Sequence, residues 1–399
     1  MVCLRIRNLL FLGFLIFPLS LYASFIETTQ GTAVVNDATA AYFNPAALVL
    51  LKNIQIIPQG SIAYFHTRFS GEATQSGAGF TQTGSSSSNT TYYSPSFYLG
   101  IPTTDKITIG LALVSNSANR DVEASSILRY VQASNTIQDF DLVPAISIKI
   151  NDCFSLGAGI NFSYANFDLQ PITGIPNLNI PDSVSHNQCD GTGWGGNAGF
   201  LITLKPSTLI GFNYRSATTY NLSGKSSFEG NPEIISDNYH FKLWTPAKSV
   251  FSINHFITPK LGFIATLQRI QWSITRNVNI INIATPQGPQ NATVLQHLRD
   301  TWLMTLGCHY RITPQWILRI AGTYNQSPGN PHYQIVTGDS IILGGSMGYE
   351  INKNISIDGS YAHAFIKNQN INIASGRNLV SGVNEASRDG ISLKLTFNL

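Results

Sequence analysis

The chain has 399 residues and a net charge of +3, and only 11% of its residues are charged while 11% are aromatic. Length alone suggests two or three soluble domains. The low charge and the wealth of Ser, Thr, Asn and Gln argue against that, and favour a wall with lipid on one side and a polar lumen on the other.

The first 23 residues have the pattern of a secretory signal peptide. Arg5 and Arg7 form a basic start, an apolar run covers 9–21, and Ala23 offers a cleavage site. A membrane anchor is the alternative, but the run is shorter than the roughly 20 apolar residues that a spanning helix needs. We expect residues 1–23 to be removed on export.

Residues 24–50 precede the first predicted strand and do not have the composition of a wall strand. The stretch 33–51 is apolar, rich in Ala, and interrupted by an Asn-Pro turn at residues 44–45. A flexible tail is the alternative, but this apolar content argues against exposure. We predict short helical turns that plug the lumen, because a wide barrel leaves a channel unless something fills it.

The remainder, residues 51–399, shows period-two alternation that is typical of β-strands. In the last segment Ile391 and Leu393 alternate with Ser392 and Lys394. The apolar set is expected to face lipid and the polar set the lumen. A soluble β-sandwich also alternates, but it would have to bury all the apolar faces in one core.

Fourteen strands emerge, and short turns alternate with long polar loops between them, which is the layout of an outer-membrane barrel. This predicts an all-β membrane protein, a 14-stranded antiparallel transmembrane β-barrel with both ends of the wall on the periplasmic side. The expected strands are 54–68, 91–101, 107–115, 139–150, 154–168, 194–204, 208–220, 241–257, 261–274, 299–312, 316–325, 341–350, 354–366 and 388–399.

Aromatic residues lie near many of the predicted strand ends. Barrels of this type carry aromatic girdles at the two membrane interfaces. The residues that we assign to such girdles are Tyr92, Tyr93, Trp244, Trp272, Trp302, Tyr310 and Trp316.

Several motifs occur in the order seen in one known family. The stretch 31–46 ends in Asn44-Pro45-Ala46, 211–216 reads Gly-Phe-Asn-Tyr-Arg-Ser, and Asp300 and Trp302 precede Trp316. Together with Tyr361-Ala-His363-Ala-Phe365, these motifs resemble the outer-membrane long-chain fatty acid transporters of the FadL/TodX group. The resemblance covers nearly the whole chain after the signal peptide. The chain ends in Leu399 rather than in the aromatic residue found at the end of many outer-membrane barrels.

The resemblance implies a transport cycle with capture at external loops, movement of a hatch and sideways exit through a kinked third strand. It places the hatch signature at Asp37, Asn44, Pro45 and Ala46, the capture loop at Ile127, Leu128, Tyr130 and Val131, and the kink at Gly110, Ser115 and Asn116.

A lumen cation would hold the carboxylate of an acidic cargo. By alternation Arg215 and Arg319 point inward, and Lys149 and Lys394 are further candidates nearer the periplasmic rim. The alternative for these cations is an internal ion pair with Asp358 or another lumen acid.

Other chemistry has little support. The glycine pattern at 191–196 matches a nucleotide-binding fingerprint in letters only, since it leads into a strand and not a helix. No catalytic constellation can be assigned. A metal pair of His186 and Cys189 would be only two ligands in a loop, and an odd number of cysteines after the signal peptide argues against a disulfide framework. We expect no enzyme activity, cofactor, metal or nucleic-acid partner.

Two functions remain open. The first is uptake of long-chain fatty acids or of aromatic or aliphatic hydrocarbons across the outer membrane of a Gram-negative bacterium. The second is a structural or adhesive surface barrel without hydrophobic transport. In either case we expect a monomer that contacts outer-membrane lipids and lipopolysaccharide and is inserted by the barrel assembly machinery.

Overall fold

The computed structural model describes residues 25–75, 79–123, 125–175, 177, 179–230, 233–275, 277–375 and 378–399. The expected signal peptide at 1–23 lies outside the described residues and stays a prediction. Within the described ranges, no helix is long and apolar enough to cross a membrane.

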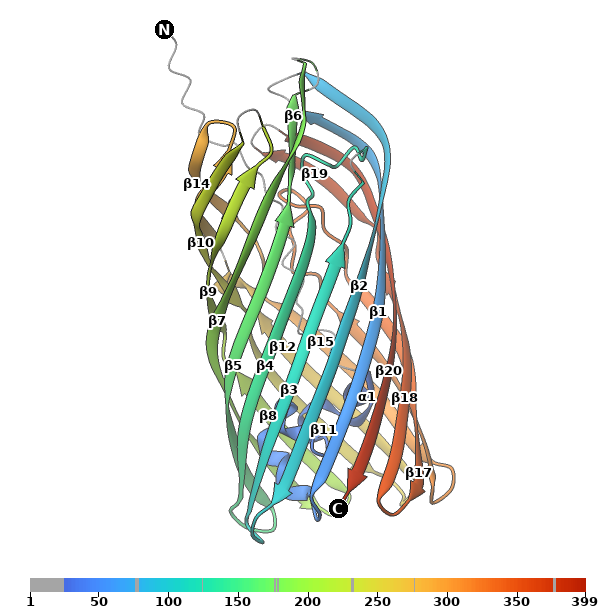
Figure 1. Ribbon diagram of the computed structural model, residues 1–399. Helices are drawn as coiled ribbons and strands as arrows, with labels where there is room; N and C mark the ends of the chain where they lie inside the picture. Colours follow the sequence, from blue (N-terminus) through green and yellow to red (C-terminus); the bar gives the residue numbers. More distant parts are fainter. Residues whose placement is uncertain are drawn as a thin grey trace.

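The chain forms a closed antiparallel β-barrel (Figure 1). The first strand, β1 (Gln55–Gln75), pairs with β2 and also with the last strand, β20 (Asn378–Asn398), which closes the wall. In the described part of the chain, twenty strands are hydrogen-bonded to one another. Four of them lie outside the wall and two wall strands are each interrupted once, so the barrel has the fourteen strands that the sequence predicts.

Between β1 and β20 the wall runs in chain order. Its strands are β2 (Phe80–Pro102), β3 (Ile107–Arg120), β4 (Ser134–Lys149), β5 (Phe154–Gln170), β7 (Ile180–Lys205), β8 (Thr208–Arg215) continued by β9 (Thr218–Phe228), β10 (Ile234–Thr245) continued by β11 (Ala247–Phe256), β12 (Leu261–Gln271), β15 (Thr301–Arg311), β16 (Trp316–Asn325), β17 (Ser340–Asn352) and β18 (Ile355–Ile366).

The two rims of the barrel differ. Short turns and the C-terminus lie at one end, here called the turn rim, and longer connections lie at the other, the loop rim (Figure 1). The elements within the loop-rim connections are β6 (Ile172–Ile175), η5 (Trp272–Ile274), β13 (Asn277–Thr285), β14 (Gly288–Leu295) and β19 (Gln369–Ser375).

Alternation in β20 shows how the wall is oriented. Ile391 and Leu393 are 63% and 52% exposed on the outside, while Ser392 and Lys394 are 6% and 1% exposed on the inside. An apolar outer surface cannot be stable in water over so many strands, whereas lipid accepts it. The predicted assignment of apolar residues to lipid and polar residues to the lumen is confirmed.

The strands at the loop rim are longer than predicted. β1 and β2 stay paired from Gln55 and Gly100 up to Gln75 and Phe80, so most of the serine-rich stretch predicted as a loop is strand. Serine and threonine give no apolar alternation, so the pattern could not reveal these residues. Pairing of the same part of β1 with β20 supplies the hydrogen bonds that hold them extended.

Two strands predicted as continuous, 208–220 and 241–257, are each broken. The second is broken at Pro246, which has no N–H to donate. The first is broken after Arg215 because the backbone N–H of Ser216 donates to the Gly196 carbonyl at 2.8 Å, and the Ser216 hydroxyl accepts from the Gly196 N–H at 2.9 Å.

The girdle assignment is wrong for two aromatic residues. Tyr92 is 3% exposed, because it alternates with its outward-facing neighbour Tyr93. Trp272 is fully buried and donates its indole N–H to the Thr301 hydroxyl at 3.1 Å, because it begins the η5 turn where the strand alternation ends. Outward-facing aromatics include Tyr93, Trp302, Tyr310 and Trp316.

Residues 25–50 lie inside the barrel toward the turn rim, and we call them the hatch (Figure 1). The hatch consists of α1 (Phe25–Gln30), η2 (Thr32–Val34), α2 (Ala40–Phe43) and η3 (Pro45–Leu50). Its Ala-rich side packs with Ile57, Val143 and Leu201 of the wall in one apolar cluster. Such short helices need tertiary packing to be stable, and the wall supplies it.

Candidate functional site

Asn44 connects the hatch to itself and to the wall. The residue is extended, at φ −160°, and its side-chain oxygen accepts from the Ala46 N–H at 3.2 Å, which caps η3 as the sequence predicts. Its side-chain nitrogen donates to the carbonyls of Ala33 at 2.7 Å and of Phe200, in β7, at 3.1 Å. The side-chain amide of Asn44 therefore links the Asn-Pro turn to the preceding hatch segment and to the wall.

The wall approaches the hatch so closely that several inward positions have no room for a side chain. A Cβ atom at Gly157 would lie 2.2 Å from the Ala46 nitrogen, and one at Gly211 would lie 1.9 Å from the Ala33 oxygen. Ser147 and Ser155 donate their hydroxyls to the Ala46 carbonyl at 3.1 and 2.9 Å. We call the wall glycines that the hatch touches in this way the glycine seat; they are Gly100, Gly110, Gly157, Gly199 and Gly211.

The opposite side of the hatch is held by charges. The ammonium group of Lys394, a 1% exposed residue in β20, lies 2.7 Å from the Asp37 carboxylate and 4.0 Å from that of Glu27. Thr39 donates to Asp37 through its hydroxyl and its N–H. Burial raises the pKa of Asp37, but Lys394 and Thr39 outweigh burial and hold this pKa below its ordinary value. Asp37 is therefore ionised at neutral pH.

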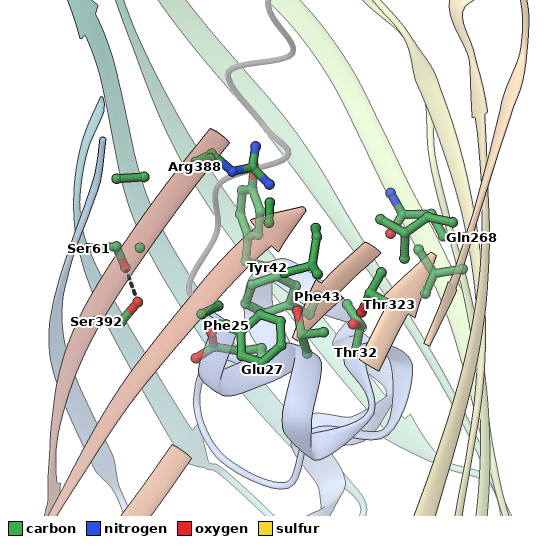
Figure 2. Close-up of a pocket in the computed structure, with 18 of the residues that line it drawn as sticks. Phe25, Glu27, Thr32, Tyr42, Phe43, Ser61, Gln268, Thr323, Arg388 and Ser392 are labelled. Carbon is green, nitrogen blue, oxygen red and sulfur yellow. Dashed lines mark hydrogen bonds between the residues drawn. The ribbon is translucent and has the colours of Figure 1, made fainter. Parts of the chain in front are cut away.

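A cavity of about 160 Å³ lies on the hatch, on its side toward the loop rim, and we call it the lumen cavity. Figure 2 shows Phe25, Tyr42 and Phe43 on the hatch side of it. One wall is small and apolar, and the rest of the lining mixes larger apolar, polar and charged side chains, Glu27 among them. The small residues are Ala63, Ala362, Ala364 and Gly390, and the polar ones include Ser61, Asn213, Gln268, Thr323 and Ser392.

Three basic residues line this cavity: Arg215, Lys248 and Arg388. Arg215 donates to the Tyr42 carbonyl at 2.6 Å and stacks its guanidinium 3.8 Å from the Tyr42 ring centroid. Its other terminal nitrogen lies 3.8 Å from the Asp141 carboxylate and has no hydrogen-bond partner among the described residues. This nitrogen is itself buried, so Arg215 contributes positive charge to the cavity beside the Asp141 carboxylate.

Arg319 lies elsewhere. It lines a second cavity, of about 410 Å³, between the hatch and the turn rim, which we call the turn-rim cavity. Its guanidinium lies 2.8 Å from the Asp358 carboxylate, the ion pair that the sequence left open as an alternative. The structure thus does not bring Arg319 together with Arg215.

The apolar group of the capture loop packs against other parts of the loop rim. Leu128 is 1% exposed and shares a cluster with Phe69, Val336 and Ile371, and Ile127 and Val131 pack against that cluster. The Tyr130 hydroxyl donates to Asp182, which is also 2.8 Å from Arg129. On the other side of the rim the β13–β14 hairpin packs into a second cluster, which includes Tyr239, Phe241, Val278, Ile280 and Ile283.

The residues expected to form a kink divide into two roles. Gly110 belongs to the glycine seat, where a Cβ would lie 2.7 Å from Leu48. Ser115 and Asn116 lie at an interruption of the β2–β3 ladder, since pairing resumes only at Ser117 with Tyr93 and at Val114 with Ser96. Pairing of β3 with β4 is continuous there. Pro95, which has no N–H, accounts for the interruption.

Sequence reasoning missed Lys248, Arg388 and the hatch aromatics. Lys248 lies an even number of residues from the inward-facing Ser252 in β11, and Arg388 lies an even number from the inward-facing Ser392 in β20. Strand alternation could therefore have placed both basic residues in the lumen. Phe25, Tyr42 and Phe43 had no such signal, because short helical turns have no strand periodicity. No cluster of His, Cys, Asp or Glu suited to a metal ion occurs in the part of the chain that the structure describes.

A closed wall with an apolar outside, a helical hatch in the lumen and a cavity above it define an outer-membrane β-barrel with a plugged channel. The chain belongs to the family described as outer membrane protein transport protein (OMPP1/FadL/TodX), whose model matches residues 28–398. It is therefore an outer-membrane transport protein and not an enzyme. The family resemblance seen in the sequence is confirmed.

Relatives agree with this assignment. Outer membrane protein P1 of Haemophilus influenzae is 20% identical over 378 residues, which covers 83% of this chain and 81% of the relative. A Pseudomonas aeruginosa FadL homologue superposes with a TM-score of 0.81 at 19% identity, covering 92% of this chain and 95% of that one. The Pseudomonas putida toluene transporter TodX gives 0.70 at 15% identity, covering 92% and 96%. These solved structures establish the shared fold.

Proposed function

We propose that the chain takes up long-chain fatty acids or similar hydrophobic compounds across the outer membrane. The lumen cavity is the observation that carries this proposal, because aromatic rings and small apolar residues lie beside Arg215, Lys248 and Arg388. A fatty acid has an apolar chain and one carboxylate. Burial of the chain stabilises the complex by about 0.8 kcal/mol per CH₂, and a basic residue can bind the acid end.

Capture takes place at the loop rim. Ile127, Tyr130 and Val131 are partly exposed around the buried Leu128, and they offer apolar surface where a poorly soluble compound arrives. The compound then passes between the two apolar clusters of the rim into the lumen cavity.

The hatch moves during transport. The lumen cavity, at about 160 Å³, is smaller than the roughly 300–1,000 Å³ that ligand sites commonly have. A long chain therefore needs more room than the closed state offers. Because the hatch forms the floor, its displacement is the change that enlarges the site.

Hydrophobic cargo leaves sideways at the interruption between β2 and β3. Ser94 and Asn116 are linked there by their side chains at 2.9 Å. Side-chain contacts that replace ladder hydrogen bonds separate more readily than an intact ladder. The name of one structural relative, a toluene transporter, supports neutral hydrocarbons as a second class of cargo.

The expected partners of the protein follow from its role in transport. The outward apolar wall contacts outer-membrane lipids and lipopolysaccharide, the barrel assembly machinery inserts it, and one copy suffices because each barrel encloses a complete lumen.

Uptake of a labelled fatty acid by a Gram-negative host without its own transporter tests the proposal. Cells with the chain are expected to accumulate palmitate faster than cells without it. Arg215→Met should slow palmitate uptake more than uptake of its neutral methyl ester, and Arg68→Met, an exposed residue of β1, is the control. Equal uptake with and without the folded chain would favour the surface-barrel alternative.

A further inference from the structure

The turn rim carries a ring of basic residues. Each of the six short turns has a lysine or an arginine in it or directly beside it, and these are Lys106, Lys149, Lys205, Lys260, Arg311 and Lys353. Two of them form ion pairs, Lys149 with Asp152 at 2.7 Å and Arg311 with Glu350 at 3.4 Å. The other four are exposed and have no ion pair among the described residues. We call them the turn lysines; they are Lys106, Lys205, Lys260 and Lys353.

Acids do not neutralise this ring. The acids of these turns and strand ends are Asp105, Asp152 and Glu350, so three acids stand against six basic residues. At the same end of the barrel, Lys52 and the carboxylate of Leu399 carry opposite charges. The loop rim differs, because many of its basic residues form ion pairs with carboxylates; these are Arg129, Lys225, Arg269 and Arg299. The barrel therefore has an excess of positive charge at the turn rim.

The turn lysines lie at the edge of the apolar outer surface. Exposed, outward-facing aliphatic side chains end five of the wall strands at this rim; they are Ile150, Leu204, Ile257, Ile312 and Ile351. Leu204 directly precedes Lys205, and Ile351 lies two residues before Lys353. A ring of exposed aliphatic side chains needs the hydrocarbon of the membrane around it. The neighbouring ammonium groups therefore lie at the depth of the lipid head groups on the periplasmic side.

We propose that the turn lysines bind the head groups of anionic phospholipids around the periplasmic end of the barrel. A lysine near an anionic membrane surface attracts it by its charge, while the aliphatic stem of the side chain lies along apolar surface. The four lysines lie at the ends of β2, β7, β11 and β17, so they are spread around the rim (Figure 1). A soluble acidic partner would need them gathered in one patch. This inference does not depend on the proposed transport function.

An anion inside the turn-rim cavity is the competing explanation for a preference of the barrel for negative charge. Lys260 and Lys353 line that cavity as well as the rim, whereas Lys106 and Lys205 do not. The two pairs of lysines therefore separate a ring of lipid contacts from a single site in the cavity.

Spin-labelled lipids measure the contact around the whole barrel. The folded barrel is reconstituted in phosphatidylcholine vesicles with a trace of spin-labelled phosphatidylglycerol or phosphatidylcholine, and the motionally restricted fractions of the two lipids are compared. Phosphatidylglycerol should be preferred roughly twofold at low salt, because each lysine near the surface attracts anionic lipid. The preference should disappear at about 1 M salt, where charges are screened beyond about 3 Å.

Replacement of all four turn lysines by glutamine should abolish the preference for phosphatidylglycerol. Lys106→Gln with Lys205→Gln should lower it about as much as Lys260→Gln with Lys353→Gln. The matched control replaces four exposed basic residues on the loop-rim half of the barrel by glutamine and should keep the preference; these are Arg68, Lys225, Lys242 and Lys367. All variants are compared at equal amounts of heat-modifiable, folded barrel.

Three outcomes of this measurement would overturn the proposal. The first is an unaltered barrel that does not prefer phosphatidylglycerol. The second is a preference that is lost in the loop-rim control and kept without the turn lysines. The third is a preference that only the Lys260 and Lys353 pair removes, which would assign it to the turn-rim cavity.

A tryptophan reporter locates the bound lipid. Leu204→Trp places an indole beside Lys205, and phospholipids brominated in the acyl chain quench its fluorescence on contact. Every other tryptophan except the buried Trp272, which lipid does not reach, is replaced by phenylalanine. Brominated phosphatidylglycerol should quench this reporter more than brominated phosphatidylcholine, and Lys205→Gln should remove the difference. A second chain that keeps Trp302, which is exposed on the outside of β15 toward the loop rim, is the control. A difference at Trp302 and none at position 204 would place the anionic lipid at the other rim and contradict the proposal.

Discussion

The barrel is closed at two levels by different means. The floor is the hatch, held by backbone groups that touch wall glycines, by Asn44 and by buried charges. The roof consists of two apolar side-chain clusters, one around Leu128 and one under the β13–β14 hairpin. Apolar clusters tolerate exchange of one side chain for another of similar volume. A backbone group that touches a wall glycine leaves no space for a larger residue at that position. We therefore expect single substitutions to affect the floor more than the roof.

Removal of the floor gives the largest expected effect. Deletion of residues 25–48 should strongly raise steady ion conductance in planar bilayers, because the hatch blocks the lumen of a barrel wide enough to conduct. The complete chain should show little current. A complete chain that conducts like an open pore would mean that the roof and hatch do not seal the channel.

The second largest effect is expected when one methyl group is added in the glycine seat. Gly157→Ala places a Cβ 2.2 Å from the Ala46 nitrogen, and such overpacking costs about 1–3 kcal/mol. The hatch should shift and conductance should rise, while the barrel remains folded. Gly359→Ala is the matched control, since a Cβ there meets no atom within 4 Å. Equal conductance of the two variants would contradict the seat.

Asn44→Ala tests the polar part of the floor. It removes the cap of η3 and the hydrogen bonds to Ala33 and Phe200, and loss of a cap costs about 0.5–2 kcal/mol. Uptake should fall at an equal amount of heat-modifiable, folded protein, because the β ladder does not involve this side chain. Unchanged uptake would show that Asn44 is only a turn residue.

The roof should respond less. Leu128→Ala leaves a cavity in the apolar cluster, but the loop-rim connections around it can shift to fill the space. The loss of stability should therefore lie at the low end of the roughly 2–5 kcal/mol seen for buried leucines. We expect a modest fall in palmitate uptake and no change in conductance. A conductance increase as large as that of Gly157→Ala would reverse the comparison between floor and roof.

Acid should loosen the floor only weakly. The pKa of Asp37 lies below its ordinary value, so the stabilisation from its ionised form is complete above the unfolded value of about 3.9. It is lost as the pH falls through the lowered pKa. Conductance should therefore stay constant from neutral pH down to the lowered pKa of Asp37 and should rise below it. Asp37→Asn should abolish this rise.

Much of the barrel could be predicted because alternation is a local property of the sequence. The same parity rule places Arg215 inside, and the chemistry of Asn-Pro predicts the cap at Asn44. The partners of these groups could not be predicted. Lys394 and Asp37 are 357 positions apart, and no periodicity indicates which wall glycines the hatch will touch. Alternation places Arg319 inside the barrel, but only the structure shows that it forms an ion pair with Asp358.

The height of β1 and β2 has a consequence for what the cell presents to its surroundings. β2 has 23 residues, whereas a tilted strand crosses a bilayer with about 9–11. About half of this hairpin is therefore longer than a membrane crossing needs, and it forms a ridge at the loop rim, where β1 and β2 reach the end of the barrel (Figure 1). Its outward side chains in β2 are mostly hydroxyls and amides, such as Thr83, Ser85, Ser87 and Asn89. The β1 strand of the same ridge exposes one charge of each sign, Arg68 and Glu72, so the ridge presents a polar surface with little net charge.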